Sequence, residues 1–249
     1  MLKNMKINLE CQYEQRLICY VDILGFSNLV KDGLVAPATL NLAIKMMNSI
    51  ANTHTSDNQT FIDSKNVVVT QFSDNLVISA PANDPSGCNL LLTSAMMIHM
   101  SLLQLGILCR GAILFGDLFH NNSAVFGPGL VKVHNLESKC AIYPRIIFGR
   151  EVFDFLKLHN LVHLLLYTQT DLDGFYYLNY IRITLDSDVS FINSHIHELR
   201  SIITQNINDD DPGKVQKYIW LAQRHNDYMN ELAQANLEGL DFIPSYISV

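Results

Sequence analysis

The chain has 249 residues, of which 49% are hydrophobic and only 16% are charged, and its formal net charge is −7. This length allows one large domain, or one domain with an appendage, and is enough to bury a sizeable core. An acidic chain without a basic run is a poor candidate for binding nucleic acid, because such binding depends on neutralising phosphates. We see no apolar run near the roughly 18 residues that span a bilayer, and residues 1–10 are polar without a signal-peptide core. The five cysteines lack CxxC spacing and are expected to be reduced thiols. We therefore expect a cytoplasmic protein that does not insert into a membrane.

Strand-like and helical segments alternate along the chain. Apolar and β-branched runs indicate the strands, and apolar residues at helical spacing indicate the helices. The expected strands are residues 16–21, 67–69, 76–78, 107–115, 117–126, 145–148, 162–168 and 175–180. The expected helices are residues 36–51, 90–105, 127–140, 151–156, 187–206 and 215–235.

The order of these elements predicts an α+β fold of the ferredoxin-like kind with a helical C-terminal extension. The last two helices are separated by the acidic breaker at residues 208–213. We expect one domain over residues 1–185, with residues 186–249 forming a helical extension packed on it.

Two carboxylates stand out. Asp22 closes a buried strand, which is costly unless the charge is paired. Gly25 follows it and allows the turn to approach a ligand, while the next amides could hold phosphate oxygens at a helix start. Asp74 lies in the turn of the first expected hairpin, and if this hairpin pairs beside strand 16–21, both carboxylates meet at one edge of the sheet. Two hard oxygen ligands would suit Mg²⁺ or Mn²⁺, although either residue alone is also typical of a turn or helix cap.

Taken together, the segments between about residues 16 and 180 resemble the class III adenylate and guanylate cyclase homology domain. Asp22 to Ser27 looks like the first metal motif of that family, and Asp74 lies where the family has its second metal Asp. The segments that carry the resemblance are Asp22-Ile23-Leu24-Gly25-Phe26-Ser27, Gln71-Phe72-Ser73-Asp74, Arg110-Gly111-Ala112-Ile113 with Gly116, Phe126-Gly127-Pro128 and Leu136-Glu137-Ser138.

The resemblance implies closure of a nucleoside triphosphate into a 3′,5′-cyclic nucleotide and diphosphate with two divalent metal ions, Mn²⁺ or Mg²⁺. Asp22 and Asp74 would hold both ions, with the carbonyl of Ile23 as a further ligand. In this family each active site takes residues from two protomers, so a homodimer is implied. The amides that would hold the phosphates are those of Leu24, Gly25, Phe26 and Ser27.

The sequence departs from the family where purines are read. Thr70 stands where the family has a base-reading Lys, and Val131 and Asn135 stand where it has an Asn and an Arg on the helix after Gly-Pro. We therefore consider other residues for these roles, while a structural ion pair for Arg110 and a solvated helix face for Lys132 stay open. The catalytic candidates are Arg110 and Lys132, and the substrate-binding candidates beyond the phosphate-holding turn are Thr70, Phe72 and Arg145.

Within that family, residues 127–138, 141–146 and 217–221 look like the pyrimidine nucleotide cyclases of bacterial Pycsar antiphage systems. This resemblance implies UTP as substrate, with CTP as the alternative, and a separate effector protein that senses the cyclic product. Two other interpretations remain. The chain could be a purine cyclase with altered base reading, or a catalytically degenerate cyclase fold that serves as a nucleotide-binding or dimerisation module.

Four histidines and the single tryptophan are expected to have structural roles and no part in metal binding or catalysis. His120, His134, His195 and His197 lack metal-ligand spacing, so surface or capping positions are expected. Trp220 is expected to anchor the last helix to the core.

Overall fold

The computed structural model describes residues 12–31, 37–53, 66–182, 188–235 and 246–248. The polar start at residues 1–10 and the expected domain boundary at residue 185 lie outside these ranges.

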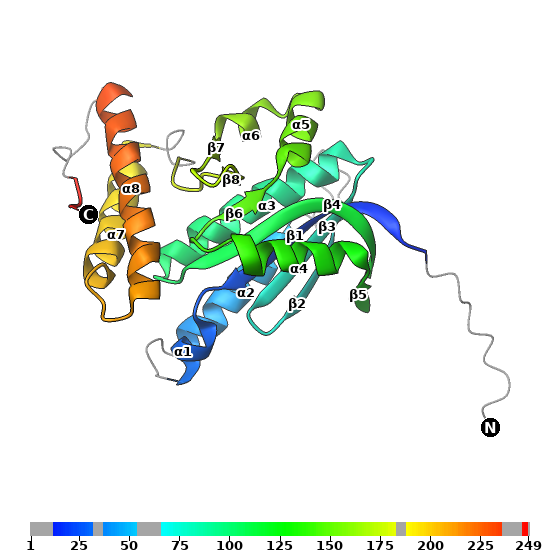
Figure 1. Ribbon diagram of the computed structural model, residues 1–249, viewed down its shortest axis with the longest axis horizontal. Helices are drawn as coiled ribbons and strands as arrows, with labels where there is room; N and C mark the ends of the chain where they lie inside the picture. Colours follow the sequence, from blue (N-terminus) through cyan, green and yellow to red (C-terminus); the bar gives the residue numbers. More distant parts are fainter. Residues whose placement is uncertain (1–11, 32–36, 54–65, 183–187, 236–245, 249) are drawn as a thin grey trace.

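One sheet organises the molecule (Figure 1). Its strand order is β2-β3-β1-β4-β6-β8-β7, and β5 pairs with β4 off this path. The strands are β1 (Glu14–Ile23), β2 (Val68–Phe72), β3 (Asn75–Pro81), β4 (Cys109–Asn121), β5 (Ala124–Phe126), β6 (Ile146–Phe148), β7 (Thr168–Thr170) and β8 (Tyr176–Leu178). Among these pairs, β4 and β6 run parallel and the others run antiparallel. The first four strands in this order, β2-β3-β1-β4, form the ferredoxin-like arrangement, with helices between β1 and β2 and between β3 and β4. The predicted fold class is therefore confirmed.

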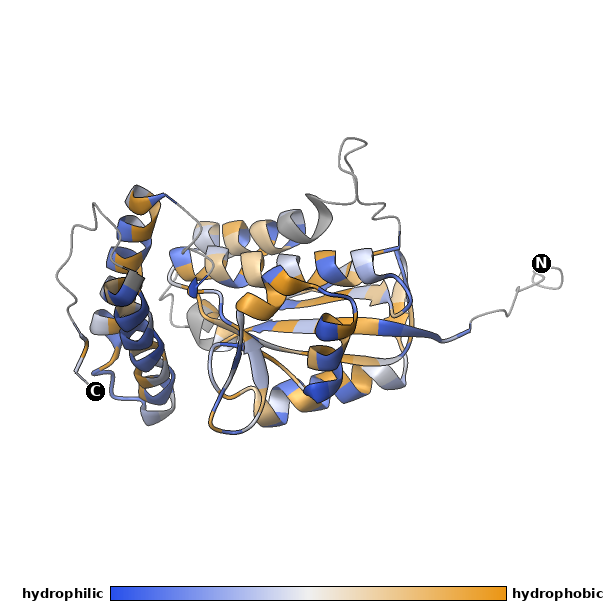
Figure 2. Ribbon diagram, turned by 90° about the horizontal axis from the view of Figure 1, so that it is seen from above, coloured by the Kyte–Doolittle hydropathy of each residue, from blue (hydrophilic) through white to orange (hydrophobic). Residues whose placement is uncertain are grey.

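Helices cover both faces of the sheet, as the view from above shows (Figure 2). The helices are α1 (Phe26–Lys31), α2 (Pro37–Thr53), α3 (Pro85–Gln104), α4 (Pro128–Cys140), α5 (Arg150–Leu158), α6 (Val162–Leu166), α7 (Val189–Asn206) and α8 (Pro212–Ala235). From β1, Leu17 and Cys19 pack in the core cluster with α2 and α3, whereas Ile18 and Tyr20 pack with α4. This double burial explains why β1 is apolar without alternation. Because side chains alternate along a strand, Asp22 lies on the face that carries α4.

Helix α4 approaches the sheet closely because two glycines meet at the contact. A Cβ atom added to Gly116 of β4 would lie 2.8 Å from the Cα of Gly129 in α4. A Cβ atom added to Gly129 would lie 2.5 Å from Cδ1 of Ile18. Both distances are shorter than real side chains allow, so the docking of α4 depends on these glycines.

Helix α3 has the length and hydropathy of a membrane-spanning helix, which is more than we expected from the sequence. However, 72% of its apolar window is buried inside the fold, so α3 serves as the central helix of the core.

Helices α7 and α8 lie side by side at one end of the molecule (Figure 1). Their apolar residues form a cluster with the end of α3 and with the region of β8, including Leu103 and Tyr177. Trp220 of α8 is only 4% exposed and stacks on Tyr143 with ring centroids 5.9 Å apart. The expected anchoring role of Trp220 is confirmed.

Most expected elements are present with shifted ends, and the described cysteines are free thiols. Two strand predictions were wrong. The expected break near Gly116 does not exist, because β4 runs unbroken to Asn121 and Gly116 serves the close contact with α4. The apolar run from Val162 forms α6 instead of a strand, and β7 begins only at Thr168. A short apolar run does not distinguish a helix from a strand by its periodicity.

Candidate active site

Asp22 and Asp74 lie at the same end of two neighbouring strands. In the ladder between β1 and β3, Asp22 is paired with Asn75, the residue that follows Asp74. The amide of Ile23 donates a hydrogen bond of 3.3 Å to the backbone oxygen of Asp74, which ties the end of β1 to the hairpin turn. The structure therefore brings together the two carboxylates that the sequence singles out, and their role as metal ligands stays a prediction.

The electrostatics of this strand end suit a divalent cation. Burial raises the pKa of Asp22; Arg110 opposes this shift and the negative charge of Asp74 adds to it. A divalent ion between the two carboxylates would relieve their repulsion. In the part of the chain that the structure describes, no three His, Cys, Asp or Glu side chains converge. An ion here would thus take its other ligands from backbone, water and phosphate oxygens, which is how Mg²⁺ is usually bound.

Arg110 links Asp22 to a buried acid on α4. Its Nε lies 2.6 Å from Oε1 of Glu137 and 3.5 Å from Oδ2 of Asp22. One terminal nitrogen also donates to the carbonyl of Ala141 at 3.4 Å. Glu137 is 2% exposed, and burial raises its pKa to about 7, against the opposing effect of Arg110. Arg110 therefore lies beside Asp22, one of the two candidate metal carboxylates. It also forms a structural ion pair with Glu137, which was the alternative role considered for it.

The turn after Asp22 offers fewer phosphate donors than expected. The amide of Leu24 already donates to the carbonyl of Leu108 at 2.9 Å. It is therefore not free to bind a phosphate oxygen, contrary to the prediction from the sequence. Gly25 has φ of 71°, which is the left-handed region that favours glycine. Phe26 and Ser27 then open the short helix α1. The remaining candidates for phosphate contact are the amides of Gly25, Phe26 and Ser27.

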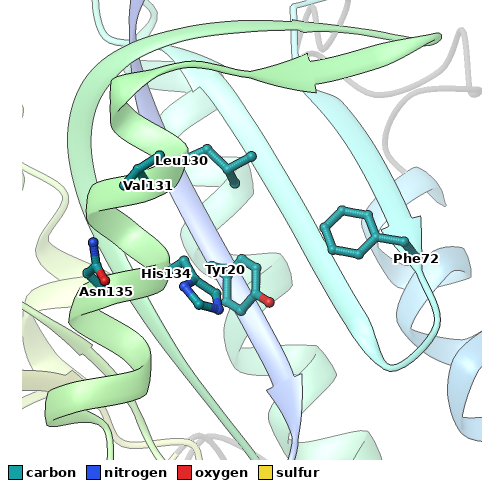
Figure 3. Close-up of a pocket in the computed structure, with 6 residues that line it drawn as sticks. All are labelled: Tyr20, Phe72, Leu130, Val131, His134 and Asn135. Carbon is teal, nitrogen blue, oxygen red and sulfur yellow. The ribbon is translucent and has the colours of Figure 1, made fainter.

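A shallow cavity of about 370 Å³ lies between the end of β2 and α4 (Figure 3). Phe72 faces it from β2 and is 41% exposed, while Tyr20 enters from β1. The hydroxyl of Tyr20 donates to Oδ1 of Asn75 at 2.6 Å, next to Asp74. The remaining lining residues, all on α4, are Leu130, Val131, His134 and Asn135.

The α4 residues that depart from the family lie on this cavity. Val131 is 62% exposed and Asn135 is also exposed, so both line the cavity without a charge. Lys132 is exposed on the same helix. Its expected catalytic role stays a prediction, and a solvated helix face fits the exposure equally well.

Arg145 is placed differently from the other candidates. Its side chain is fully buried, and its two terminal nitrogens pair with the carboxylates of Asp171 and Asp173. The same Asp171 accepts a 2.7 Å hydrogen bond from the indole of Trp220. This geometry ties α8 to the sheet and gives no support to Arg145 as a substrate ligand.

Sequence reasoning missed two polar residues near the site. Glu137 was noted only as part of a motif, although its spacing of four from the buried Val133 places both on the sheet-facing side of α4. His120 was expected at the surface and is instead 8% exposed, where its Nε2 lies 2.9 Å from Oγ1 of Thr70. No spacing signal in the sequence points to this contact, because it joins β4 to β2 across the sheet.

The chain is similar in fold to solved nucleotide cyclases, although no protein-family model matches it and no curated protein matches it significantly. The guanylyl cyclase domain of the RhoGC fusion protein from Blastocladiella emersonii is 16% identical, with a TM-score of 0.46 over 67% of this chain and 95% of that one. The adenylyl cyclase CyaB from P. aeruginosa is 15% identical, with a TM-score of 0.44 over 59% and 82%. A bacterial light-regulated adenylyl cyclase is 14% identical, with a TM-score of 0.46 over 77% and 99%. Likenesses at this level do not assign an activity to the chain.

Proposed function

We propose that this protein is a nucleotide cyclase that converts UTP, or alternatively CTP, to the 3′,5′-cyclic nucleotide and diphosphate. The observation that carries the proposal is the placement of Asp22 and Asp74 at one strand end, joined through the hydrogen bond from Ile23 to the backbone of Asp74. The ordered motifs around these residues resemble those of class III cyclases, which adds support.

In the proposed reaction the ribose 3′-oxygen attacks the α-phosphorus, and the bond from that phosphorus to the bridging oxygen breaks. Diphosphate leaves with the electron pair, and the 3′-hydroxyl proton passes to water. Bound divalent ions would neutralise the triphosphate and make the 3′-hydroxyl more acidic. Asp22, Asp74 and the carbonyl of Ile23 would hold these ions in place.

Other residues of the chain would position the substrate. The amides of Gly25, Phe26 and Ser27 would bind phosphate oxygens at the start of α1. Arg110, beside Asp22, would offset negative charge as diphosphate departs.

We further propose that two copies form the active enzyme. Phe72 and Val131 expose large apolar side chains around the cavity of Figure 3, and a second protomer would cover them. We also propose that the product serves as a second messenger in bacterial antiphage defence, read by a separate effector in the cytoplasm. This last step rests on the sequence resemblance alone.

The test is a product assay with the purified chain and ATP, GTP, CTP or UTP, each with Mn²⁺ or Mg²⁺. We expect a cyclic pyrimidine nucleotide from the wild type and background levels from Asp22→Asn and Asp74→Asn. Asp154→Asn is the matched control, because Asp154 is an exposed aspartate paired only with its helix neighbour Arg150 among the described contacts. Full activity of Asp74→Asn would overturn the metal assignment. A product from ATP or GTP at a comparable rate would replace the pyrimidine assignment with a purine one, and no product from any nucleotide would favour the binding module.

A further inference from the structure

The side chains of Tyr20, Asp22 and Asn75 lie on the same face of the sheet. Tyr20 and Asp22 are two residues apart in β1, and the side chains of a strand alternate between the two faces. Asn75 of β3 is the antiparallel partner of Asp22, and residues paired in this way share a face. Figure 3 shows the ring of Tyr20 between α4 and the hairpin of β2 and β3. This register brings a phenol and an amide next to the candidate metal carboxylates.

Two hydrogen bonds connect Tyr20 to the second of these carboxylates through Asn75. The hydroxyl of Tyr20 donates to Oδ1 of Asn75 at 2.6 Å, and Nδ2 of Asn75 donates to Oδ1 of Asp74 at 3.3 Å. Tyr20 is 6% exposed, and its ring lies edge-on against His134 with the ring centroids 5.4 Å apart. Packing therefore holds the hydroxyl from which this relay starts.

The chemistry of the three groups allows only one direction for the relay. A carboxylate can only accept hydrogen bonds, so the amide nitrogen of Asn75, and not its oxygen, must face Asp74. The amide oxygen then faces Tyr20, whose phenol supplies the hydrogen. A reversed amide would set its oxygen against the carboxylate of Asp74. The hydroxyl of Tyr20 therefore stabilises the one orientation of the amide in which Asn75 can donate to Asp74.

We propose that Tyr20 and Asn75 are positioning residues that hold the carboxylate of Asp74 in place for the divalent ion. Asp22 and Asp74 repel each other at the strand end, and this repulsion favours rotation of Asp74 away from Asp22. A donor on Oδ1 of Asp74 opposes that rotation, and the other carboxylate oxygen can bind the cation. Tyr20 and Asn75 both lie just outside the motifs that carry the family resemblance. The inference rests on the proposed function and deepens its metal site.

The test measures Mn²⁺ binding to the full chain without nucleotide, with free Mn²⁺ followed by electron paramagnetic resonance. Asn75→Ala removes the donor to Asp74 and should weaken Mn²⁺ binding by about tenfold or more, the usual effect of losing a partner of a metal ligand. Tyr20→Phe keeps the ring and removes only the hydroxyl, so it should weaken binding by a smaller factor. The double variant should bind Mn²⁺ no more weakly than Asn75→Ala, because Tyr20 acts through Asn75.

Tyr177→Phe is the matched control, because it removes the same kind of hydrogen bond away from the site. Tyr177 is fully buried in β8, the second strand beyond β4, and its hydroxyl donates to Oε1 of Gln169 at 2.7 Å. Urea unfolding should show a loss of stability in both Tyr→Phe variants, since each leaves an amide oxygen without its donor. Only Tyr20→Phe should also lose Mn²⁺ affinity, which a merely structural hydroxyl would not change.

The outcomes distinguish this inference from the proposed reaction. Unchanged Mn²⁺ affinity in Tyr20→Phe and Asn75→Ala, with binding lost in Asp74→Asn, would overturn the relay and leave the metal site and the reaction intact. An effect of Tyr20→Phe that persists in full in the Asn75→Ala background would also overturn it.

Two further results bear on the proposed function itself. Weakened Mn²⁺ binding in both variants, without cyclic product from any nucleotide, would support the relay and refute the reaction. Mn²⁺ binding by Asp74→Asn that equals that of the wild type, or no binding by the wild type, would refute the metal assignment and the relay together.

Discussion

The Nε atom of Arg110 lies 2.6 Å from Oε1 of Glu137, on a helix that crosses the face of the sheet. The same Nε lies 3.5 Å from Oδ2 of Asp22, the candidate metal ligand. Arg110 therefore forms ion pairs with two acids and lies closer to Glu137 than to Asp22. The attraction of Glu137 weakens the interaction of Arg110 with Asp22. A metal ion and the guanidinium of Arg110 would compete for the carboxylate of Asp22. Because Glu137 attracts Arg110, it should favour the binding of the metal ion to Asp22.

We expect Glu137→Gln and Arg110→Gln to change Mn²⁺ affinity in opposite directions. At about pH 8, above the pKa of about 7 that burial gives to Glu137, this carboxyl is charged in the wild type. Without its charge the guanidinium turns to Asp22, and Mn²⁺ binding should weaken by about tenfold, the effect of a charge within 4–6 Å. Without Arg110 the competing cation is gone, and Mn²⁺ should bind more tightly. Free Mn²⁺ is measured by electron paramagnetic resonance in the absence of nucleotide.

Glu151→Gln is the control for this pair, because Glu151 is an exposed acid at the start of α5. Affinity changes in the same direction for both variants would contradict the competition, since a loss of local structure would weaken binding in each case.

Buried neutral histidines should make the protein less stable below pH 6.5. His99 and His195 are each 2% exposed, and burial lowers the pKa of His99 to about 3 and that of His195 to about 4. The unfolded chain binds these protons from about pH 6.5 downwards while the folded chain does not, so the free energy of unfolding falls as pH falls from 6.5 towards 4. Each histidine contributes a slope of up to about 1.4 kcal/mol per pH unit in this window.

Urea unfolding at pH 7.5, 6.5, 5.5 and 4.5 measures this slope. In His99→Leu the slope of the free energy of unfolding against pH should decrease below pH 6.5 by up to about 1.4 kcal/mol per pH unit, which corresponds to one proton. This change in slope is expected whatever the change in absolute stability. His163→Gln is a suitable control, because His163 is exposed and pairs with Asn89 on the surface. An equal slope in His99→Leu and the wild type would show that His99 is not a buried neutral group.

The sequence allowed the fold class and the position of both carboxylates to be predicted, for reasons visible in β1 and the first hairpin. Residues 17–21 are buried on both faces, so their run of apolar side chains has no polar interruption before Asp22. Asp74 sits in a turn whose flanking strands are rich in β-branched residues. Local chemistry determines both features, so the sequence alone predicts them.

Residues whose environment depends on distant segments could not be predicted. Arg145 was considered as a replacement for the missing substrate-binding residues of the family, yet Asp171 and Asp173 neutralise it after a separation of 26 and 28 residues. His120 was expected at the surface or in a capping position, yet its Nε2 lies 2.9 Å from Oγ1 of Thr70, 50 residues away. Burial of a charged or titratable group is a tertiary property that short-range spacing does not encode.

The pairing of Trp220 with Asp171 predicts how firmly α8 is held. The indole Nε1 donates to Oδ2 of Asp171 at 2.7 Å, and Asp171 also pairs with the buried Arg145. Trp220→Phe keeps an aromatic ring but leaves Asp171 without this donor. We expect a loss of about 2–4 kcal/mol in the free energy of unfolding, from one hydrogen bond to a charged acceptor and a smaller ring.

Thermal and urea unfolding measure this loss, and limited proteolysis within α8 should become faster. Tyr246→Phe removes an exposed hydroxyl that donates to Asn230, and it should change stability by less than about 0.5 kcal/mol. A Trp220→Phe variant as stable as this control would mean that the contact with Asp171 contributes nothing to the docking of α8.

The close contact of Gly129 with the sheet predicts that a methyl group added at this position will displace α4 together with its side chains. A Cβ atom at Gly129 would meet Cδ1 of Ile18 at 2.5 Å and the backbone oxygen of Asp117 at 3.0 Å, and a backbone atom cannot move aside as a side chain can. Gly129→Ala should therefore destabilise the fold by about 1–3 kcal/mol, the usual cost of overpacking. Because Glu137 lies on the same helix, Mn²⁺ affinity should fall together with stability.

Gly149→Ala is the matched control, since a Cβ atom there meets nothing within 4 Å and the backbone has an ordinary φ of −89°. Because Gly149 is the N-cap of α5, where Ala is less favourable than Gly, the stability of this variant should stay within about 1 kcal/mol of the wild type. Equal behaviour of the two alanine variants would show that α4 can shift without cost. In that case the position of Glu137 would not depend on the close approach of Gly116 and Gly129. The ion pair between Glu137 and Arg110 would then not depend on it either.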